Sequence, residues 1–384
     1  MKLNKTIDNN ILTIHFDGEI NSTNSQSVHD EIVSLLEKDI NNLVFDFSNL
    51  SYISSAGLRI LLVIKKQYDS LKIVGCNLEV YDILEMTGFT KIINVSKALK
   101  EISVDGCKVI GEGRAGIVYR INKDTIVKVY KRADSLESIQ RELDLSKQAF
   151  VLGIPTAISF DIVKVGSRFA ARYEMLDFLT LRDFLANNPD KYLEYAEKWA
   201  NLVKKINTTE STTNDLINKK DKWLKELNII KDSLDEGMFN KLKEMVEDIK
   251  DTNTFIHGDC HPKNIMFNGD EVYLIDMGSL AVGNPIFELA PLYRTFILFD
   301  ILDPGNTGRF FELDHDLAMK FFKAFMNNYF DNYNEEIENK IRLTALIYFC
   351  GWLHRYNSDN KENFERIIKE IKELTPKVNN LNIW

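Results

Sequence analysis

The chain has 384 residues, of which 45% are hydrophobic and 27% are charged, and its formal net charge is -9. These values are typical of a soluble globular protein, and the length predicts two or three domains. Residues 1–104 hold 10 Lys+Arg against 13 Asp+Glu, and the remainder holds 38 against 44. Because neither part is basic, a nucleic-acid partner is disfavoured.

The four cysteines lie far apart and form no CxxC pair. Neither a disulfide framework nor a zinc site is therefore expected, and a reducing cytosol fits best. The N-terminus, MKLNKTIDNN, lacks the apolar run of a signal peptide, and no stretch approaches the roughly 18 apolar residues of a membrane span. We expect a cytoplasmic protein without a membrane partner.

Strand and helix patterns alternate over the first hundred residues. They predict strands over 11–16, 42–47 and 71–75 and helices over 26–38, 56–67 and 79–87. Such alternation predicts a small α/β domain with helices against a mixed sheet, ending near residue 103.

A second domain, residues 104–384, is predicted to follow without a long linker. Residues 107–130 are typical of a strand, a glycine loop and two more strands, and the pattern is mostly helical from 134 onward. Short β-like runs interrupt it within 255–276, and helical spacing returns over 286–373.

Gly111, Gly113 and Gly116 form a GxGxxG pattern. Glycines let the backbone approach phosphate groups closely, with N–H groups donating to them. By itself the pattern favours a plain hairpin turn. However, it leads into the strand-like run IVYRI rather than into a helix, as in kinase-type phosphate loops.

Lys128 lies between valines in the strand-like run IVKVY. A lysine flanked by buried residues needs partners for its ammonium, and ATP phosphates together with a helix carboxylate would supply them. Glu142 in the amphipathic stretch 136–148 is the candidate carboxylate and Glu137 is the alternative. Either glutamate could instead belong to a solvated helix face.

The stretch HGDCHPKN, residues 257–264, is followed by LID ending at Asp276. Phosphoryl transfer needs a carboxylate at the acceptor hydroxyl and oxygen ligands for magnesium. Asp259 suits the first role, and Asn264 and Asp276 suit the second. A polar loop between two strands is the structural alternative, but it does not explain why these residue types follow a glycine loop and a strand lysine.

These motifs resemble the aminoglycoside phosphotransferase and choline kinase-like superfamily, over residues 107–384. Protein kinases carry HRDxxxxN and DFG where this chain has HGDCHPKN and IDMG. The resemblance implies an α+β two-lobed kinase-like fold, with an N-lobe at about 104–174 and a C-lobe at about 177–384. It also implies ATP and Mg²⁺ as cofactors and Asp259 as the catalytic carboxylate.

The same resemblance implies further roles. Lys128 would bind ATP phosphates, Asn264 and Asp276 would bind magnesium, and adenine would lie against the segment Glu174-Met175. His257 and His261 are interpreted as residues that order the loop.

One departure from the family pattern follows the metal aspartate. Members often show GDPxxDLA, whereas this chain has Asn284 and Glu288 at the two aspartate positions. The departure weakens the inference of an aminoglycoside acceptor. Acidic residues beyond 285 could favour a cationic acceptor, or they could be solvated surface: Glu288, Asp300, Asp303, Glu312 and Asp314.

Ser54 and Ser55 lie between a buried strand and a helix, and one of them is expected to cap the helix. Phosphorylation is the functional alternative, since a phosphate there would face the open N–H groups of the helix. Residues 1–100 resemble the STAS domain of anti-sigma factor antagonists, through GEI near residue 18, SSAGL and EVYDILEMTGF. The resemblance makes Ser55 the matching phospho-acceptor and implies a regulatory protein partner.

Three functions are considered. The first is an ATP- and magnesium-dependent phosphotransferase that acts on a hydroxyl of a small molecule and carries a STAS regulatory or docking domain. The second is a signalling protein whose kinase-like domain phosphorylates a STAS serine or regulates partner binding. The third is a catalytically silent binding module, which the presence of Lys128, Asp259, Asn264 and Asp276 disfavours.

Overall fold

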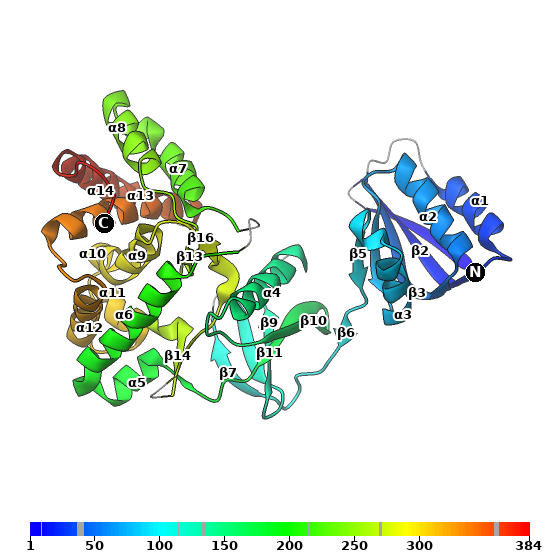
Figure 1. The fold of residues 1–384 in the computed structure, drawn as a ribbon, viewed down its shortest axis with the longest axis horizontal. Helices are drawn as coiled ribbons and strands as arrows, with labels where there is room; N and C mark the ends of the chain where they lie inside the picture. Colours follow the sequence, from blue (N-terminus) through cyan, green and yellow to red (C-terminus); the bar gives the residue numbers. More distant parts are fainter. Residues whose placement is uncertain are drawn as a thin grey trace. The chain divides into compact units, whose positions relative to one another are not determined.

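The computed structural model describes residues 1–8, 10–36, 42–113, 115–131, 136–212, 216–268, 271–356 and 361–384. The chain divides into two compact units: Met1–Ser103 with Val163–Ser167, and Val104–Ile162 with Arg168–Trp384 (Figure 1). None of the helices in these described ranges is long and apolar enough to cross a membrane.

The first unit is a five-stranded mixed sheet in the order β1-β2-β3-β4-β5 with helices packed on it. Only the β1–β2 pair is antiparallel. The elements are β1 (Lys2–Asp8), β2 (Ile11–Ile20), α1 (Ser25–Leu35), β3 (Asn42–Ile53), α2 (Ser55–Gln67), β4 (Lys72–Cys76), α3 (Leu78–Met86), a 3-10 turn (Phe89–Lys91) and β5 (Asn94–Lys97). This is the predicted α/β arrangement.

Alternation along the central strands builds the core of this unit. Phe16 on β2 packs against Phe45 and Phe47 on β3, with ring centroids 4.9 Å apart in both pairs. The helix predicted over 26–38 ends at Leu35, and residues 37–38 lie outside the described residues. Two strands, β1 and β5, were not predicted. On β1 only Leu3 is buried, so the apolar alternation that identifies a strand is missing.

The second unit begins with a sheet and continues as a helical part. The sheet comprises β7 (Lys108–Glu112), β8 (Gly116–Arg120), β9 (Thr125–Tyr130), β10 (Ser159–Val165) and β11 (Arg168–Glu174), in the order β10-β11-β9-β8-β7, and α4 (Leu136–Val151) follows β9. The short strand β6 (Lys100–Glu101) pairs in parallel with the end of β10, and these paired residues are counted with the first unit. Strands β10 and β11 were not predicted, because charged residues such as Asp161 and Arg172 interrupt their apolar pattern; these two form an ion pair.

The helical part of the second unit carries the short strands that hold the motif residues. Its helices are α5 (Leu181–Asn187), α6 (Tyr192–Thr208), α7 (Lys219–Ile229), α8 (Glu236–Glu247), α9 (Ile286–Tyr293), α10 (Phe299–Leu302), α11 (Asn306–Phe311), α12 (His315–Tyr329), α13 (Glu335–Tyr356) and α14 (Lys361–Leu374). Its strands are β12 (Leu179–Thr180), β13 (Phe255–Ile256), β14 (Ile265–Phe267), β15 (Val272–Leu274) and β16 (Ala281–Val282). A π-helical turn, Arg294–Leu298, joins α9 to α10, and 3-10 turns span Pro189–Lys191, Lys231–Ser233, Pro262–Asn264, Met277–Ser279 and Thr375–Lys377.

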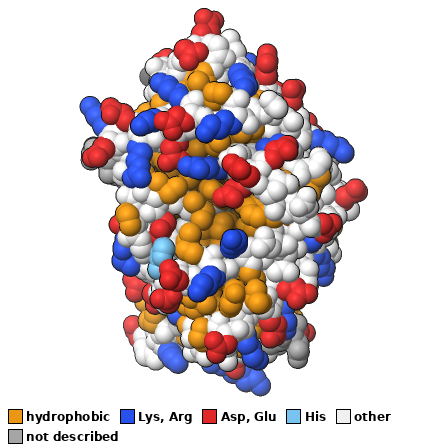
Figure 2. All heavy atoms as spheres, turned by 90° about the vertical axis from the view of Figure 1, so that its left-hand side faces the viewer, with side chains coloured by type: hydrophobic (Ala, Val, Ile, Leu, Met, Phe, Trp, Pro, Cys, Tyr) orange, Lys and Arg blue, Asp and Glu red, His pale blue; other side chains and the backbone are white. Residues whose placement is uncertain are grey.

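The helical part has a large core in which aromatic rings stack. Trp199 on α6 is fully buried and stacks on Phe325 of α12 with ring centroids 3.9 Å apart. Its indole N–H donates to the carbonyl of Cys260, at 3.0 Å. The core therefore contacts the HGDCHPKN loop directly. Figure 2 shows the outer face of this part, on which acidic and basic side chains are interspersed around a band of apolar ones.

Candidate active site

The glycine loop joins β7 to β8. Gly113 donates its N–H to the carbonyl of Gly116, at 2.9 Å, which closes the turn. Gly116 lies against β9, and a Cβ there would be 2.5 Å from the carbonyl oxygen of Val129. By contrast, a Cβ on Gly113 would meet nothing within 4 Å. Gly116 is thus required for backbone packing, while Gly113 leaves open space in front of the loop.

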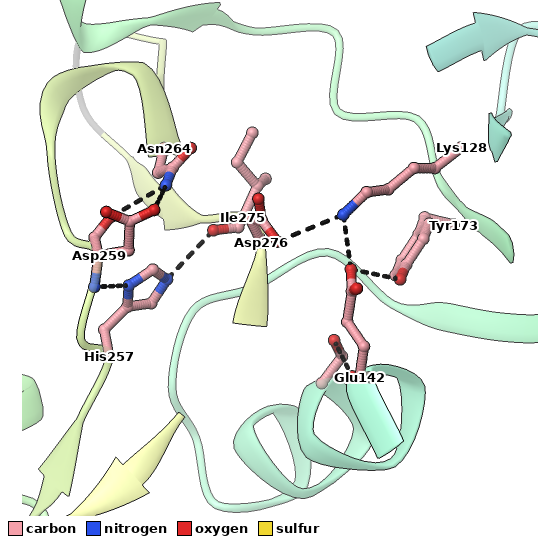
Figure 3. Close-up of polar contacts among 9 residues, drawn as sticks. Lys128, Glu142, Tyr173, His257, Asp259, Asn264, Ile275 and Asp276 are labelled. Atoms are coloured by element: carbon pink, nitrogen blue, oxygen red, sulfur yellow. Dashed lines mark hydrogen bonds and ion pairs between the residues drawn. The ribbon is translucent and has the colours of Figure 1, made fainter. Parts of the chain in front are cut away.

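Lys128 on β9 is the most strongly paired cation of the site. Its Nζ lies 2.7 Å from Oε1 of Glu142 on α4 and 3.3 Å from Oδ1 of Asp276 (Figure 3). The hydroxyl of Tyr173 on β11 donates to the same Glu142 oxygen, at 3.2 Å. Glu142 is therefore the helix carboxylate that meets Lys128, whereas Glu137 is exposed in the first turn of α4.

The charge state of Lys128 follows from these partners. Burial lowers its pKa, but the carboxylates of Asp276 and Glu142 outweigh burial and raise the pKa above its usual value. Lys128 is therefore an ammonium at neutral pH, held between two carboxylates that come from different parts of the sequence. A cation in this position suits a polyanionic ligand.

The HGDCHPKN loop follows β13 and is ordered from within. The Asp259 N–H donates to Nδ1 of His257, at 3.2 Å, so the ring proton lies on Nε2, which donates to the carbonyl of Ile275 at 3.1 Å. Asn264 donates through Nδ2 to the carbonyl and Oδ2 of Asp259, at 2.9 and 3.2 Å. Its Oδ1 is thereby directed away from this contact, and His257 links the loop to the residue before Asp276 (Figure 3).

Glu288 on α9 binds the backbone of this loop. Its carboxylate is fully buried and accepts the backbone N–H groups of His257, at 2.6 Å, and of Gly258, at 3.0 Å. Burial raises the pKa of Glu288. Gly258 has φ +79°, a left-handed conformation that favours glycine. The two N–H groups therefore anchor the loop just before Asp259.

Comparison of the sequence with models of protein families shows which family the chain belongs to. A model described as "phosphotransferase enzyme family" matches residues 106–310, and a model of the STAS domain matches residues 2–102. The chain belongs to the phosphotransferase enzyme family. It joins a STAS domain to a phosphotransferase domain, as the sequence motifs indicated.

Individual relatives match different parts of the chain. The protein BtrV of Bordetella bronchiseptica, whose name assigns it to the anti-sigma factor antagonists, is 32% identical over 102 residues, which are 26% of this chain and 88% of BtrV. The gentamicin complex of aminoglycoside phosphotransferase APH(2'')-IIa has 19% identity over 77% of this chain and 97% of that chain (TM-score 0.45). A choline/ethanolamine kinase family protein from Mesorhizobium loti has 12% identity, with 70% and 87% coverage (TM-score 0.43).

Magnesium and ATP are the cofactors that the phosphotransferase family implies. Asp276 has a left-handed backbone with φ +63°, and its carboxylate and Asn264 Oδ1 are the hard oxygen ligands that Mg²⁺ prefers. The described ranges contain no group of three or more His, Cys, Asp or Glu side chains that could hold a metal alone. This donor set fits a magnesium ion whose other ligands are nucleotide phosphates and water.

The segment Glu174–Met175, where adenine is expected, has its N–H groups engaged in the phosphotransferase domain. Glu174 donates its N–H to the carbonyl of Ile158, at 2.8 Å, and Met175 donates to the carbonyl of Asp124, at 3.0 Å. An adenine at this segment would therefore have to use other groups than these two donors.

The five acidic residues beyond 285 that were named as possible ligands of a cationic acceptor each have a partner within the phosphotransferase domain. Glu288 binds the loop backbone, Asp303 pairs with Arg309, and Asp314 caps α12. Asp300 accepts from the N–H of Thr307 and contacts His315, while Glu312 pairs with Lys263 and Arg182. Asn284 likewise serves a turn, accepting the N–H of Ile286.

Lys219, the first residue of α7, is a site residue that sequence patterns did not reveal. Only 8% of it is exposed, and its Nζ donates to the carbonyl of Ser279, at 2.8 Å. It belongs to the run KKDKW, which is typical of a solvated helix start. No sequence signal distinguishes it from Lys220, which pairs with Asp251.

Proposed function

We propose that this protein is an ATP- and magnesium-dependent phosphotransferase that transfers the γ-phosphoryl group to a hydroxyl of a small molecule. The observation that carries the proposal is the Lys128 ammonium between Glu142 and Asp276. A lysine paired with a helix carboxylate and adjacent to a metal-binding aspartate is the arrangement that kinase-like enzymes use to position ATP phosphates. The family match supports phosphotransfer as the reaction class.

Each residue has a role in this proposal. Asp259 orients the acceptor hydroxyl and takes its proton while the new P–O bond forms and the bond from the γ-phosphorus to the β-phosphate oxygen breaks. Lys128 and the loop glycines Gly111, Gly113 and Gly116 hold the phosphates. Asn264 and Asp276 would hold magnesium, which supplies charge neutralisation on the phosphates.

The STAS domain is proposed as a regulatory or protein-docking domain, and the protein as cytoplasmic. All four cysteines are unpaired, which suits a reducing compartment. The domain match and the similarity to BtrV support a protein partner at this domain.

The test is ATP turnover by the full chain in the presence of a panel of amino sugars, amino alcohols and peptides. Asp259→Asn should lower turnover by about 10²–10⁴-fold, the range that general-base catalysis contributes. Asp190→Asn, on an exposed 3-10 turn, is the matched control and should retain full activity. Full activity in Asp259→Asn would disprove the assignment.

A second candidate function is phosphorylation of a STAS serine, in cis or on a partner STAS domain. Ser54 is the N-cap of α2 and accepts the N–H of Gly57 at 3.4 Å, whereas Ser55 is exposed at the first helical position. A phosphate on Ser55 would lie at the positive end of the α2 dipole.

Phosphosite mass spectrometry after incubation with ATP and Mg²⁺ tests this second candidate. The expected result is label on Ser55, lost in Ser55→Ala but not in Ser54→Ala. Active enzyme without label on either serine would contradict it. Ser54→Ala alone should reduce the stability of the STAS domain, by about 0.5–2 kcal/mol, since it removes the cap.

A further inference from the structure

A cavity of about 420 Å³ lies between α4, the start of α7 and the segment that follows Asp276. This volume is within the range of small-molecule sites. Its charged lining residues are Arg141 and Glu142 from α4 and Lys219 and Lys222 from α7. The cavity therefore adjoins the proposed active site, because Glu142 belongs to both.

The charge of the lining is unbalanced. Glu142, its carboxylate, is already paired with Lys128. Arg141 is exposed at the edge, Lys222 is half-buried and approaches the hydroxyl of Tyr348 at 3.4 Å, and Lys219 is buried. Three cations consequently surround the space without a free counter-charge in the lining.

Lys219 is the most deeply buried of the three. Within the described part of the chain, the Ser279 carbonyl is the only hydrogen-bond partner of its ammonium, which has three N–H donors. Burial, together with the neighbouring charge of Lys222, lowers the pKa of Lys219 to about 8. The folded chain thus holds the Lys219 ammonium in a buried position near Lys222, which costs free energy. An anionic ligand in the cavity would offset that cost.

The same lysine connects the cavity to the proposed catalytic loop. A Cβ on Gly258 would be 2.7 Å from Lys219 Nζ, so the glycine before Asp259 leaves the room that the ammonium occupies. The carboxylates of Asp259 and Glu288 are close enough to Lys219 to raise its pKa against the effect of burial. A group bound at Lys219 therefore lies near the carboxylate that would receive an acceptor hydroxyl.

We propose that this cavity binds an anionic group, a phosphate or a carboxylate, of the hydroxyl-bearing acceptor, with Lys219, Lys222 and Arg141 as its ligands. The inference rests on the proposed function and narrows it to acidic alcohols.

Calorimetry with inorganic phosphate tests the site itself. The full chain is first saturated with AMP-PNP and Mg²⁺, so that the nucleotide's own phosphate positions are filled. We expect phosphate to bind, and Arg141→Gln and Lys222→Gln each to weaken it by about tenfold. Lys225→Gln removes an exposed charge from the same helix outside the cavity and should bind phosphate like the wild type. No phosphate binding, or binding unaffected by both cavity variants, would overturn the proposal.

Turnover with matched alcohols separates an acceptor group from a free anion. Glycerate and glycerol 3-phosphate should be phosphorylated at least about tenfold more efficiently than glycerol and ethanolamine, and Lys222→Gln should remove this preference. Phosphate binding without any preference for acidic alcohols would mean a free-anion site and would overturn the acceptor assignment. Failure of AMP-PNP to bind would instead contradict the proposed function. In that case the cavity is still tested by titrating phosphate into the nucleotide-free wild type and into nucleotide-free Arg141→Gln and comparing the two affinities.

Discussion

The buried carboxylate of Glu288 accepts the backbone N–H of Gly258 at 3.0 Å and that of His257 at 2.6 Å, and so fixes the loop that carries Asp259. Gly258 and Glu288 are 30 positions apart in the sequence. A side-chain carboxylate thus accepts the two backbone N–H groups, which in a β-sheet would donate to the carbonyl groups of a neighbouring strand. The two N–H groups stabilise the buried carboxylate, although its burial raises its pKa.

Glu288→Ala should lower the free energy of unfolding of the phosphotransferase domain by about 2–4 kcal/mol, because it leaves the buried N–H of His257 and the partly buried N–H of Gly258 without their acceptor. All four tryptophans lie beyond residue 198, so guanidinium unfolding followed by tryptophan fluorescence reports on this domain alone. Glu244→Ala on the exposed face of α8 is the control and should change stability by less than about 0.5 kcal/mol. Equal stability of the two variants would disprove the anchoring role.

Lys128→Met should weaken AMP-PNP binding by about 10–100-fold, since a charged hydrogen bond to phosphate is lost. Glu142→Gln should have a smaller effect, because the ammonium keeps its charge and its contact with Asp276. In the double variant the two effects should not add, with a coupling of about 1–3 kcal/mol, because the residues are in direct contact. Calorimetric titration measures each dissociation constant. Lys147→Met, exposed on α4, is the control, and additive effects in the double variant would contradict the pairing.

Gly116→Ala should destabilise the phosphotransferase domain by about 1–3 kcal/mol, because its Cβ would overlap the Val129 carbonyl and force β8 away from β9. Gly113→Ala is the matched control: it has open space at the Cβ position and should stay within about 0.5 kcal/mol of the wild type. Thermal unfolding compares them. If both alanines are tolerated equally, the close approach of Gly116 to β9 is not important for folding.

Lys219 should make stability depend on pH in a defined direction. Burial, and then the charges of Lys222 and Arg141, lower its pKa to about 8 in the folded chain against the opposing effect of the Glu288 and Asp259 carboxylates, whereas an ordinary lysine has a pKa of 10.5. Between these values the unfolded chain binds more protons, so the contribution of Lys219 to the unfolding free energy rises with pH from about 8 to about 10.5.

The difference in unfolding free energy between wild type and Lys219→Met should therefore change by on the order of 2 kcal/mol between pH 7 and pH 10, in favour of the wild type at pH 10. Guanidinium unfolding followed by tryptophan fluorescence at both pH values measures it. Lys225→Met, which alters an exposed lysine on the same helix, should show no such change. An identical difference at both pH values for Lys219→Met would show that the buried ammonium is not perturbed.

Helices and strands whose apolar residues recur at a regular spacing could be predicted from the sequence. The apolar spacing of α2 and the alternation within β2 and β3 depend only on which residues face a common core, so local pattern suffices. Strands β10 and β11 were missed because their Asp161–Arg172 ion pair supplies a stabilising contact that looks polar along the chain. Ser54 as the cap was anticipated only as one of two serines, since the choice depends on which serine keeps an extended backbone before the first helical turn.

The sequence by itself indicated a STAS domain joined to a phosphotransferase-family domain and predicted the residues of the candidate site, because HGDCHPKN, IDMG and the GxGxxG loop are contiguous motifs that are recognised by residue type and spacing. Only the tertiary structure decided which acids are engaged internally and where cations collect. Glu288 departs from the family pattern in the sequence and becomes an anchor in the fold, while Lys219 changes from one lysine in a polar run to a buried ammonium beside Gly258. Burial and charge pairing depend on residues far apart in the chain, and these interactions have no local signature.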